Sequence, residues 1–207
     1  MGKRRANKYE RIQVLRYFNL NTENSVLISS EEDFIKYSDF IDRYDEFSVR
    51  TFFKHETNEM PTHLAAITKQ EFFEVYKDLL KVNLNLIVAE QIDPKDAEFA
   101  GCIMRDGYKT IVEIAYGPVT VRRVTRDGII DERHVCYGFL PHTPNLKVNK
   151  ALVELYWFDR STSYPLDECI YEFSYYKIPV GWKRQRVIFW EITGAYHQEI
   201  KLVYRSE

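Results

Sequence analysis

Apolar and polar residues follow a helical period in three segments of the first half of the chain and a strand-like pattern in two others. Ile12, Leu15 and Phe18 recur every three residues, a spacing that places their side chains on one face of a helix. Thr68, followed by Glu71, supplies a capping box for a later helix. The pattern predicts helices over 6–18, 29–41 and 68–80, and strands over 24–29 and 47–53.

The second half of the chain has a different character. Short runs of high β-propensity follow one another from residue 85, and Asp-Gly pairs at 106–107 and 127–128 between them are hairpin signals. These runs predict an antiparallel meander. The predicted elements are strands over 85–92, 98–104, 110–117, 119–125 and 129–135, helices over 148–158 and 165–177, and a closing hairpin over 187–193 and 199–204.

The order of these elements predicts an α+β protein: an antiparallel β meander and flanking helices, arranged as two small lobes around a cleft. We expect one domain over 1–207, with an α/β lobe over 1–84 and a second lobe over 85–207. The apolar content of 45% and aromatic content of 15% are typical of a globular chain and exclude disorder.

Composition also limits the setting and the partners. No apolar run reaches the roughly 20 residues of a membrane span, and no apolar segment follows the basic N-terminus as in a secretory signal. The three cysteines are far apart, so neither a disulfide framework nor a zinc cluster is predicted, and we expect a reducing, cytoplasmic setting. The net charge of −2 argues against nucleic acid as the main partner, although the first 16 residues are strongly basic.

Few residues carry an independent chemical signal. The five histidines lack metal-ligand spacing, and neither a Walker loop nor a GxGxxG loop is present. Arg122 and Arg123 would point to opposite faces of their predicted strand, so at most one could face a cleft. The predicted strand at 86–93 ends in acidic and amide side chains. It is either a buried central strand that reaches solvent, or a hinge strand that pairs with an adenine edge and a ribose.

Taken together, several segments resemble the ATP-binding domain of phosphoenolpyruvate synthase and pyruvate phosphate dikinase, a branch of the ATP-grasp fold. The resemblance is spread over nearly the whole chain, in short motifs. The matching stretches are "KRRANKYE" at the N-terminus, "SVLISSEEDFIKYSDFI", "FSVRTFF", "LIVAEQIDPKDAEFAGCIM", "VEIAYGPVT", "VIFWEIT" and "LVYR".

The resemblance implies an ATP-grasp-like fold, a nucleotide ligand (ATP) and Mg²⁺ as the accompanying ion. It also implies a role for each matched position. The phosphate contacts fall on Arg50 and on Arg4 or Lys3, and Arg205 matches a further arginine of the family. The adenine and ribose contacts fall on Glu90, Gln91 and Ile92. The carboxylates that remain for a cation are Glu113 and Glu191.

Two departures from the family pattern leave the activity open. Phe189 and Val203 stand where the family has its metal-binding Glu and Gln. Glu191 lies two residues beyond Phe189, so a regular strand would put it on the same face, where it could substitute. A working site predicts phosphoryl or pyrophosphoryl transfer from ATP to a partner protein or small acceptor. The alternatives are a non-catalytic interaction module, and a protein that binds RNA or an acidic partner through its basic N-terminus.

Overall fold

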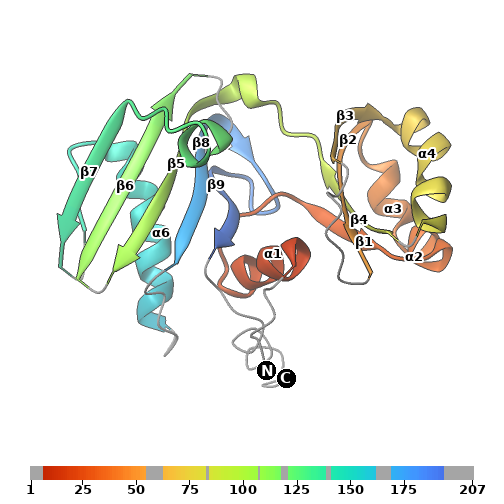
Figure 1. The fold of residues 1–207 in the computed structure, drawn as a ribbon, viewed down its shortest axis with the longest axis horizontal. Helices are drawn as coiled ribbons and strands as arrows, with labels where there is room; N and C mark the ends of the chain where they lie inside the picture. The colour runs from red at the N-terminus through yellow and green to blue at the C-terminus, as the bar shows by residue number, and fades with distance from the viewer. Residues whose placement is uncertain are drawn as a thin grey trace. The chain divides into compact units, whose positions relative to one another are not determined.

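The computed structural model describes residues 7–54, 63–82, 84–106, 108–117, 121–138, 141–161 and 169–193, with the side chains of 122, 123 and 157–161 left out. It divides the chain into two compact units (Figure 1). Unit 1 combines the ranges Met1–Thr22 and Asp93–Glu207, and unit 2 is the continuous range Glu23–Ile92. Among the described residues, no helix is long and apolar enough to cross a membrane.

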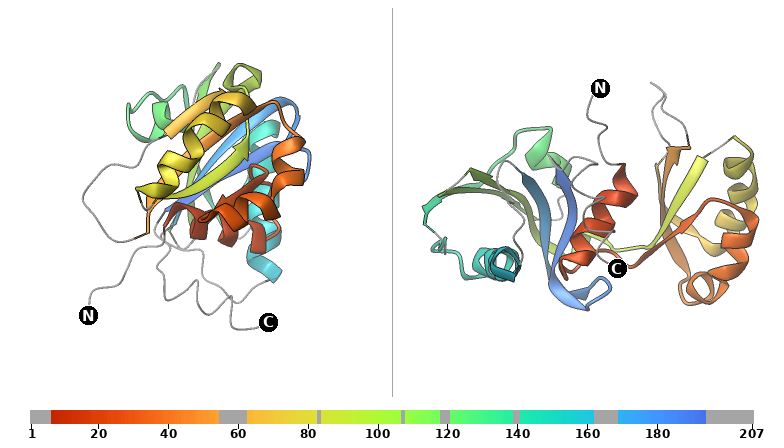
Figure 2. Two further views of the ribbon diagram at one scale, coloured as in Figure 1. Left: turned by 90° about the vertical axis from the view of Figure 1, so that its right-hand side faces the viewer. Right: turned by 90° about the horizontal axis from the view of Figure 1, so that it is seen from below.

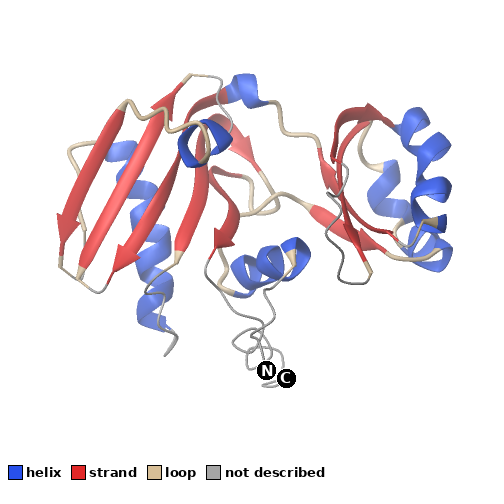
Figure 3. Ribbon diagram, viewed as in Figure 1, coloured by secondary structure: helices blue, strands red, loops and turns tan. Residues whose placement is uncertain are grey.

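Unit 2 is a four-stranded antiparallel sheet with its helices on one face (Figure 3). The strand order is β1-β4-β2-β3, and the left view in Figure 2 shows the helices in front of the sheet. A core of Phe, Leu, Val and Ile side chains lies between the two layers. The elements are β1 (Ser25–Ile28), α2 (Glu31–Lys36), α3 (Ser38–Asp42), β2 (Glu46–Phe53), β3 (His63–Thr68), α4 (Lys69–Lys81) and β4 (Leu84–Glu90).

Unit 1 contains a five-stranded antiparallel sheet with the order β7-β6-β5-β8-β9. The long helix α6 packs on one face, as the right view of Figure 2 shows, and α1 packs beside the edge strand β9. The elements are α1 (Lys8–Tyr17), the short 3-10 helix η1 (Pro94–Asp96), β5 (Ala97–Asp106), β6 (Lys109–Tyr116), α5 (Val121–Thr125), β7 (Glu132–Tyr137), α6 (Leu146–Ser161), β8 (Ile170–Val180) and β9 (Gln185–Thr193).

Local sequence signals account for several boundaries. Helix α4 begins after Thr68, whose side chain accepts from the Glu71 backbone N–H (3.2 Å), while the Glu71 carboxylate accepts from the Thr68 backbone N–H (2.7 Å). This is the predicted capping box. Gly101 is needed where β5 and β6 approach closely, because a Cβ there would lie 2.3 Å from the backbone oxygen of Glu113.

Two segments have a different secondary structure from the one predicted. The segment 119–125, predicted as a strand, contains the helix α5, so the expectation that Arg122 and Arg123 point to opposite strand faces no longer applies. The segment 165–177, predicted as a helix, contributes most of β8. Its Tyr171, Phe173 and Tyr175 are buried at every second position, as on one face of a strand.

The division into units differs from the predicted lobes over 1–84 and 85–207. Helix α1 belongs to unit 1 because it packs on β9, near the other end of the sequence. Strand β4 belongs to unit 2 because it lies between β1 and β2 in that unit's sheet. The second strand predicted for the closing hairpin, 199–204, lies outside the described residues.

Candidate functional site

A row of polar side chains crosses the entire sheet of unit 1. The pairing register places Arg133 of β7 opposite Glu113 of β6, and Glu113 opposite Cys102 of β5. Cys102 is also paired with Glu172 of β8, and Glu172 with Glu191 of β9. Directly paired residues of antiparallel strands point to the same face, so all five side chains project on one side of the sheet. We call this set the carboxylate row.

A β-bulge in β9 places Glu191 in the row. Phe189 is paired with Phe173, whereas Glu191 is paired with Glu172, so Trp190 is an extra residue between the two pairs. Phe173 and Glu172 are neighbours in β8 and point to opposite faces. Phe189 and Glu191 therefore also point to opposite faces, and the prediction that they share a face is wrong. The Trp190 indole N–H donates to the Ser174 hydroxyl at 2.8 Å, which fixes the bulge on the side of the row.

Two cations of α1 hold the carboxylate of Glu191. The Lys8 Nζ atom donates to Oε2 at 2.8 Å, and the Arg11 guanidinium donates to Oε1. A capping box formed by Asn7 and Glu10 fixes the start of the helix beside Lys8. Burial by itself would raise the pKa of Glu191, but Lys8 and Arg11 outweigh it and hold the pKa below its usual value.

Glu172, in the middle of the row, has the opposite titration behaviour. Burial and the neighbouring charge of Glu191 raise the pKa of Glu172, and Lys8, Arg126 and Arg11 offset only part of this. Among the described residues, Glu172 has no hydrogen bond or ion pair to another side chain.

The other end of the row is held differently. The Arg133 Nε atom lies 3.3 Å from Glu113 Oε1. Between them and Glu172 lies Cys102, where burial, together with Glu113 and Glu172, raises the thiol pKa to about 12. A thiol with so high a pKa stays protonated at neutral pH and is a poor nucleophile and metal ligand.

The two carboxylates predicted for a metal, Glu113 and Glu191, share the row but do not come together. They are three strand intervals apart, which corresponds to about 14 Å between their backbones. In the part of the chain that the structure describes, no three His, Cys, Asp or Glu side chains converge as a metal-binding group. The neighbour of Glu191 is instead Glu172.

The predicted nucleotide residues of unit 2 lie on both sides of its sheet. Glu90 is paired with Phe47 and therefore points to the helix-covered face, whereas Arg50 points to the opposite face. The Arg50 guanidinium forms an ion pair with Glu23, whose side chain is only 3% exposed. The Glu90 carboxylate accepts from the Asn24 backbone N–H at 3.2 Å.

The remaining predicted residues divide into two groups. The Gln91 side chain accepts from the Ala66 backbone N–H at 3.0 Å, and its own amide donates to the Ile92 carbonyl at 3.4 Å. Both residues lie beyond the end of β4. The predicted phosphate residues at the chain ends, Lys3, Arg4 and Arg205, lie outside the described residues, as does Val203.

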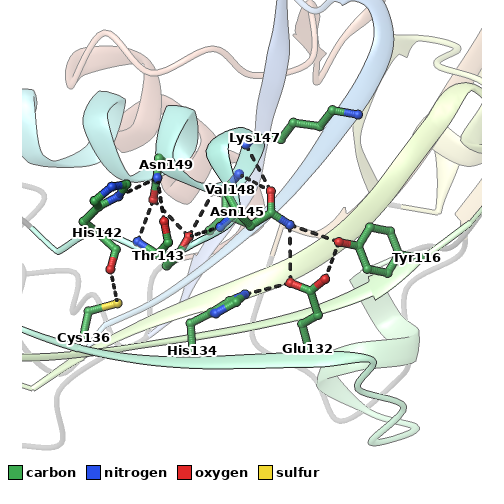
Figure 4. Close-up of polar contacts among 10 residues, drawn as sticks. All are labelled: Tyr116, Glu132, His134, Cys136, His142, Thr143, Asn145, Lys147, Val148 and Asn149. Carbon is green, nitrogen blue, oxygen red and sulfur yellow. Dashed lines mark hydrogen bonds and ion pairs between the residues drawn. The ribbon is translucent and has the colours of Figure 1, made fainter.

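A second polar cluster lies on unit 1 where β6, β7 and the start of α6 meet (Figure 4). The Glu132 carboxylate accepts from the Tyr116 hydroxyl, lies 2.8 Å from His134 Nε2 and is 3.4 Å from the Asn145 amide nitrogen. The hydrogen bond to Glu132, together with burial, raises the pKa of Tyr116 to about 12, and the same hydrogen bond is the main reason that the pKa of Glu132 is lowered.

Asn145 gives this cluster a structural role. Its Oδ1 atom accepts from the backbone N–H groups of Lys147 (3.1 Å) and Val148 (3.3 Å), and so it caps the first turn of α6. The Asn149 Oδ1 atom accepts from the Thr143 backbone N–H at 2.9 Å, which holds the preceding loop against the helix. The hydrogen bonds of Figure 4 therefore attach α6 to β6 and β7.

Glu172 and the partners Lys8, Arg11 and Glu23 are not among the site residues predicted from the sequence. Glu172 was hidden because its segment was assigned to a helix, although alternation in "YEFSYY" was available as a strand signal. Lys8 and Arg11 were noted only as part of a basic N-terminus. Their contact with Glu191 joins residues about 180 positions apart, and local patterns carry no such information.

No family model matches the chain, and no curated protein matches it. Several solved structures do match the chain. D-alanyl-alanine synthetase A from Vibrio cholerae matches with a TM-score of 0.50 and 8% identity, over 97% of this chain and 65% of that one. At this level the likeness concerns the fold, and it confirms the predicted ATP-grasp-like fold class.

Two further matches have lower TM-scores. Macrocyclase MdnC from Microcystis aeruginosa, bound with precursor peptide MdnA, gives 0.48 with 14% identity, over 90% of this chain and 51% of that one. An ATP-grasp ligase from Chryseobacterium gregarium, in complex with ADP and a leader and core peptide, has a TM-score of 0.47 and 12% sequence identity. The match covers 94% of this chain and 54% of that one. The chain spans about half the length of these two proteins. The finer resemblance to phosphoenolpyruvate synthase is not shown by these comparisons.

Proposed function

We propose that the chain binds a nucleotide of the ATP class at the carboxylate row of unit 1. The observation that carries the proposal is the charge pattern: three carboxylates in register across one sheet face, with Lys8 and Arg11 on one end and Arg133 on the other. Triphosphate recognition needs cations for the phosphate oxygens and carboxylates for a bound metal. The ATP-grasp-like fold is consistent with this assignment.

The residues present fit a magnesium ion at one position of the row. Mg²⁺ is commonly held by one or two carboxylates together with the phosphates of a nucleotide. Glu172 and Glu191, paired across β8 and β9, would hold it, and Glu113 would not. When bound, the ion would neutralise phosphate charge. Arg126, which lies close enough to lower the pKa of Glu172, would contribute a further positive charge beside the pair.

The nucleotide residues predicted in unit 2 form a separate candidate on sequence grounds, independent of the carboxylate row of unit 1. Arg50 is a candidate phosphate ligand that would have to exchange Glu23 for a phosphate oxygen. The backbone of Glu90, Gln91 and Ile92 is the candidate adenine contact, with the side chains of Glu90 and Gln91 held by Asn24 and Ala66. Lys3, Arg4 and Arg205 remain candidate phosphate contacts on sequence grounds. A protein or small molecule as phosphoryl acceptor also remains part of the hypothesis.

A thermal-shift titration with ATP, ADP and AMP, each with and without Mg²⁺, tests the proposal. A ligand at about 100 times its dissociation constant stabilises the native state by roughly 2.7 kcal/mol, which such an assay detects. We expect a shift with ATP that is reduced in Arg133→Met and in Arg11→Met. The matched control is Lys147→Met, since Lys147, on α6, pairs with Glu98 of β5 and lies outside the row. The absence of a shift with every nucleotide would refute the proposal.

A second function, a non-catalytic binding module, is favoured by one observation. Each carboxylate oxygen of Glu191 already holds a cation of α1, so the site presents positive charge to an anion without any metal. Magnesium separates the two functions. A catalytic site predicts tighter ATP binding with Mg²⁺, whereas a module that recognises anions through Lys8 and Arg11 predicts the same affinity with and without the ion.

A further inference from the structure

Strand β7 is an edge of the unit 1 sheet that lacks the usual obstacles to further pairing. It lies at one end of the strand order, at the left in Figure 1, and among the described residues only β6 pairs with it. Natural edge strands are commonly interrupted by bulges, proline or lysine, or are covered by a helix. The register of β7 with β6 is regular, and its sequence "ERHVCY" contains neither proline nor lysine. Its outer side is therefore suited to accept another strand.

The other sheet edges of the described structure are protected. Helix α1 packs beside β9, which also carries the bulge at Trp190. In unit 2, β3 pairs with β2 through an irregular register and contains Ala66 with a positive φ of 54°. The remaining edge strand, β1, has only four residues. Strand β7 thus differs from each of them.

The backbone of β7 shows which residues offer hydrogen bonds at this edge. The Gly138 backbone N–H donates to the Tyr108 carbonyl at 2.8 Å, across the β6–β7 pair. In an antiparallel ladder every second residue bonds to the same neighbouring strand, so the even-numbered residues of β7 bond to β6. The backbone groups of the odd-numbered residues therefore point outward: Arg133, Val135 and Tyr137.

The side chains of these three residues share the face of the carboxylate row and are accessible. Val135 is 45% exposed and Tyr137 is 72% exposed. The Arg133 side chain is 58% exposed beside its ion pair with Glu113. The edge thus combines outward backbone donors and acceptors with two large apolar side chains and one cation.

This edge is complementary to itself. Two copies of one strand that pair antiparallel are related by a two-fold axis, so the pairing is the same in both directions. With Val135 on the axis, Arg133 of each copy lies opposite Tyr137 of the other, and a guanidinium beside a tyrosine ring is favourable. All three outward residues then exchange hydrogen bonds, about six in total. An axis at Arg133 would instead place two like charges opposite each other.

We infer that β7 pairs antiparallel with β7 of a second copy of this chain, with Val135 on the two-fold axis. A single strand pair is a small interface, so the dimer is weak and reversible. The pairing also brings Tyr137 of the second copy beside Arg133, at one end of the carboxylate row. A role of this tyrosine in nucleotide binding rests on the proposed function, whereas the pairing itself does not.

Sedimentation velocity of the full chain without nucleotide tests the pairing, over concentrations from about 1 to about 200 µM, where a small interface dissociates. We expect a reversible dimer. Val135→Lys places two like charges on the axis and should weaken dimerisation at least about fivefold. The matched control is Val153→Lys, the same change at a 63% exposed residue of α6, which should leave dimerisation unchanged. A monomer throughout this range, or equal weakening in the control, would overturn the inference.

Two substitutions at the exposed Tyr137 test the register. Tyr137→Lys puts a cation opposite Arg133 in both halves of the dimer and should weaken dimerisation about tenfold. Tyr137→Glu puts a carboxylate there and should retain or tighten the dimer. With His134 on the axis, Tyr137 would lie opposite Asp131 and the order of the two variants would reverse, so a reversed order or equal effects would refute the register. Nucleotide is omitted throughout, and the thermal shift with ATP therefore tests the proposed function separately.

Discussion

The two faces of the unit 1 sheet are built from the same five strands but have opposite chemistry. On one face, Phe99 stacks on Tyr175 with ring centroids 5.4 Å apart, and Phe173 lies 6.4 Å from Phe189. Helix α6 completes this core. On the other face, the strands present the carboxylate row, with a smaller apolar cluster against α5. Alternation along the strands separates a stable core from a charged surface, and in β9 this separation also requires a bulge.

The difference depends on one residue in β9. Without the bulge at Trp190, Glu191 would follow Phe189 into the aromatic core, and an unpaired carboxylate buried there would cost several kcal/mol. With the bulge, the strand contributes an aromatic ring to one face and a carboxylate to the other within three residues. Bulges are frequent beside functional sites because they redirect a side chain in this way.

Two partly buried glutamates of unit 1 show how the environment decides the cost of a charge. Glu154 lies on α6, the helix that covers the aromatic face, and burial raises its pKa to about 7, with only Lys183 opposing. Glu191 is also partly buried, yet Lys8 and Arg11 keep its pKa below the usual value. The first carboxylate therefore opposes folding when ionised, and the second supports it.

The largest expected effect comes from the aromatic face. Phe189→Ala removes a fully buried ring and should destabilise unit 1 by about 3–5 kcal/mol. Guanidinium unfolding followed by tryptophan fluorescence measures this, because Trp157, Trp182 and Trp190 all belong to unit 1. A loss below about 1 kcal/mol would mean that Phe189 does not lie in the core, and the bulge assignment would fail with it.

The next effect concerns Glu154 and depends on pH. The folded-state pKa of about 7 lies above the usual 4.5 of a glutamate, so the contribution to stability is full below about pH 4.5 and is lost as the pH rises through 7. Glu154→Gln removes this loss, so the variant should exceed the original protein by up to about 3 kcal/mol at pH 8 and by little at pH 4.5. Unfolding curves at both pH values test the difference. Asp127→Asn, at an exposed turn, is the control and should show no such dependence.

Glu191→Gln should have the opposite pH dependence. The lowered pKa of Glu191 means that its stabilisation is present above its unfolded pKa and is lost as the pH falls through the folded one. At pH 7 the variant should lose about 2 kcal/mol, since two hydrogen bonds to a charged group are weakened. Toward pH 3 the two proteins should converge. A variant that is more stable than the original at pH 7 would show that Lys8 and Arg11 do not offset the burial of Glu191.

Local sequence signals predicted much of the fold. The capping box of Thr68 and Glu71 is formed as expected, and β1, β2, β4, β5 and β6 lie where short apolar runs were bounded by turn residues. Such features depend on residues within a few positions of one another. The segment of α5 was misassigned because "VTVRRVT" has high β-propensity, and packing of Val121 and Val124 against β5 and β6 overrides that preference.

The candidate site was predicted only in part, for a physical reason. Glu191 and Glu113 were identified as carboxylates, but their grouping depends on strand order, which places β5 and β8 between them. The contact of Glu191 with Lys8 depends on the docking of α1 against β9. The bulge at Trp190 inserts one residue and reverses the assignment of faces, and no residue type in "FWEI" indicates it.

The smallest expected effect tests the bulge that separates the two faces. Trp190→Phe removes the indole N–H and leaves the Ser174 hydroxyl without its 2.8 Å donor, while it preserves an aromatic ring against Tyr176. The loss should be about 1 kcal/mol, the net value of a hydrogen bond. Double replacement with Ser174→Ala should cost little more than the single change, because the two side chains share one interaction. Additive losses would instead show that Trp190 and Ser174 act independently, and the bulge would then need another cause.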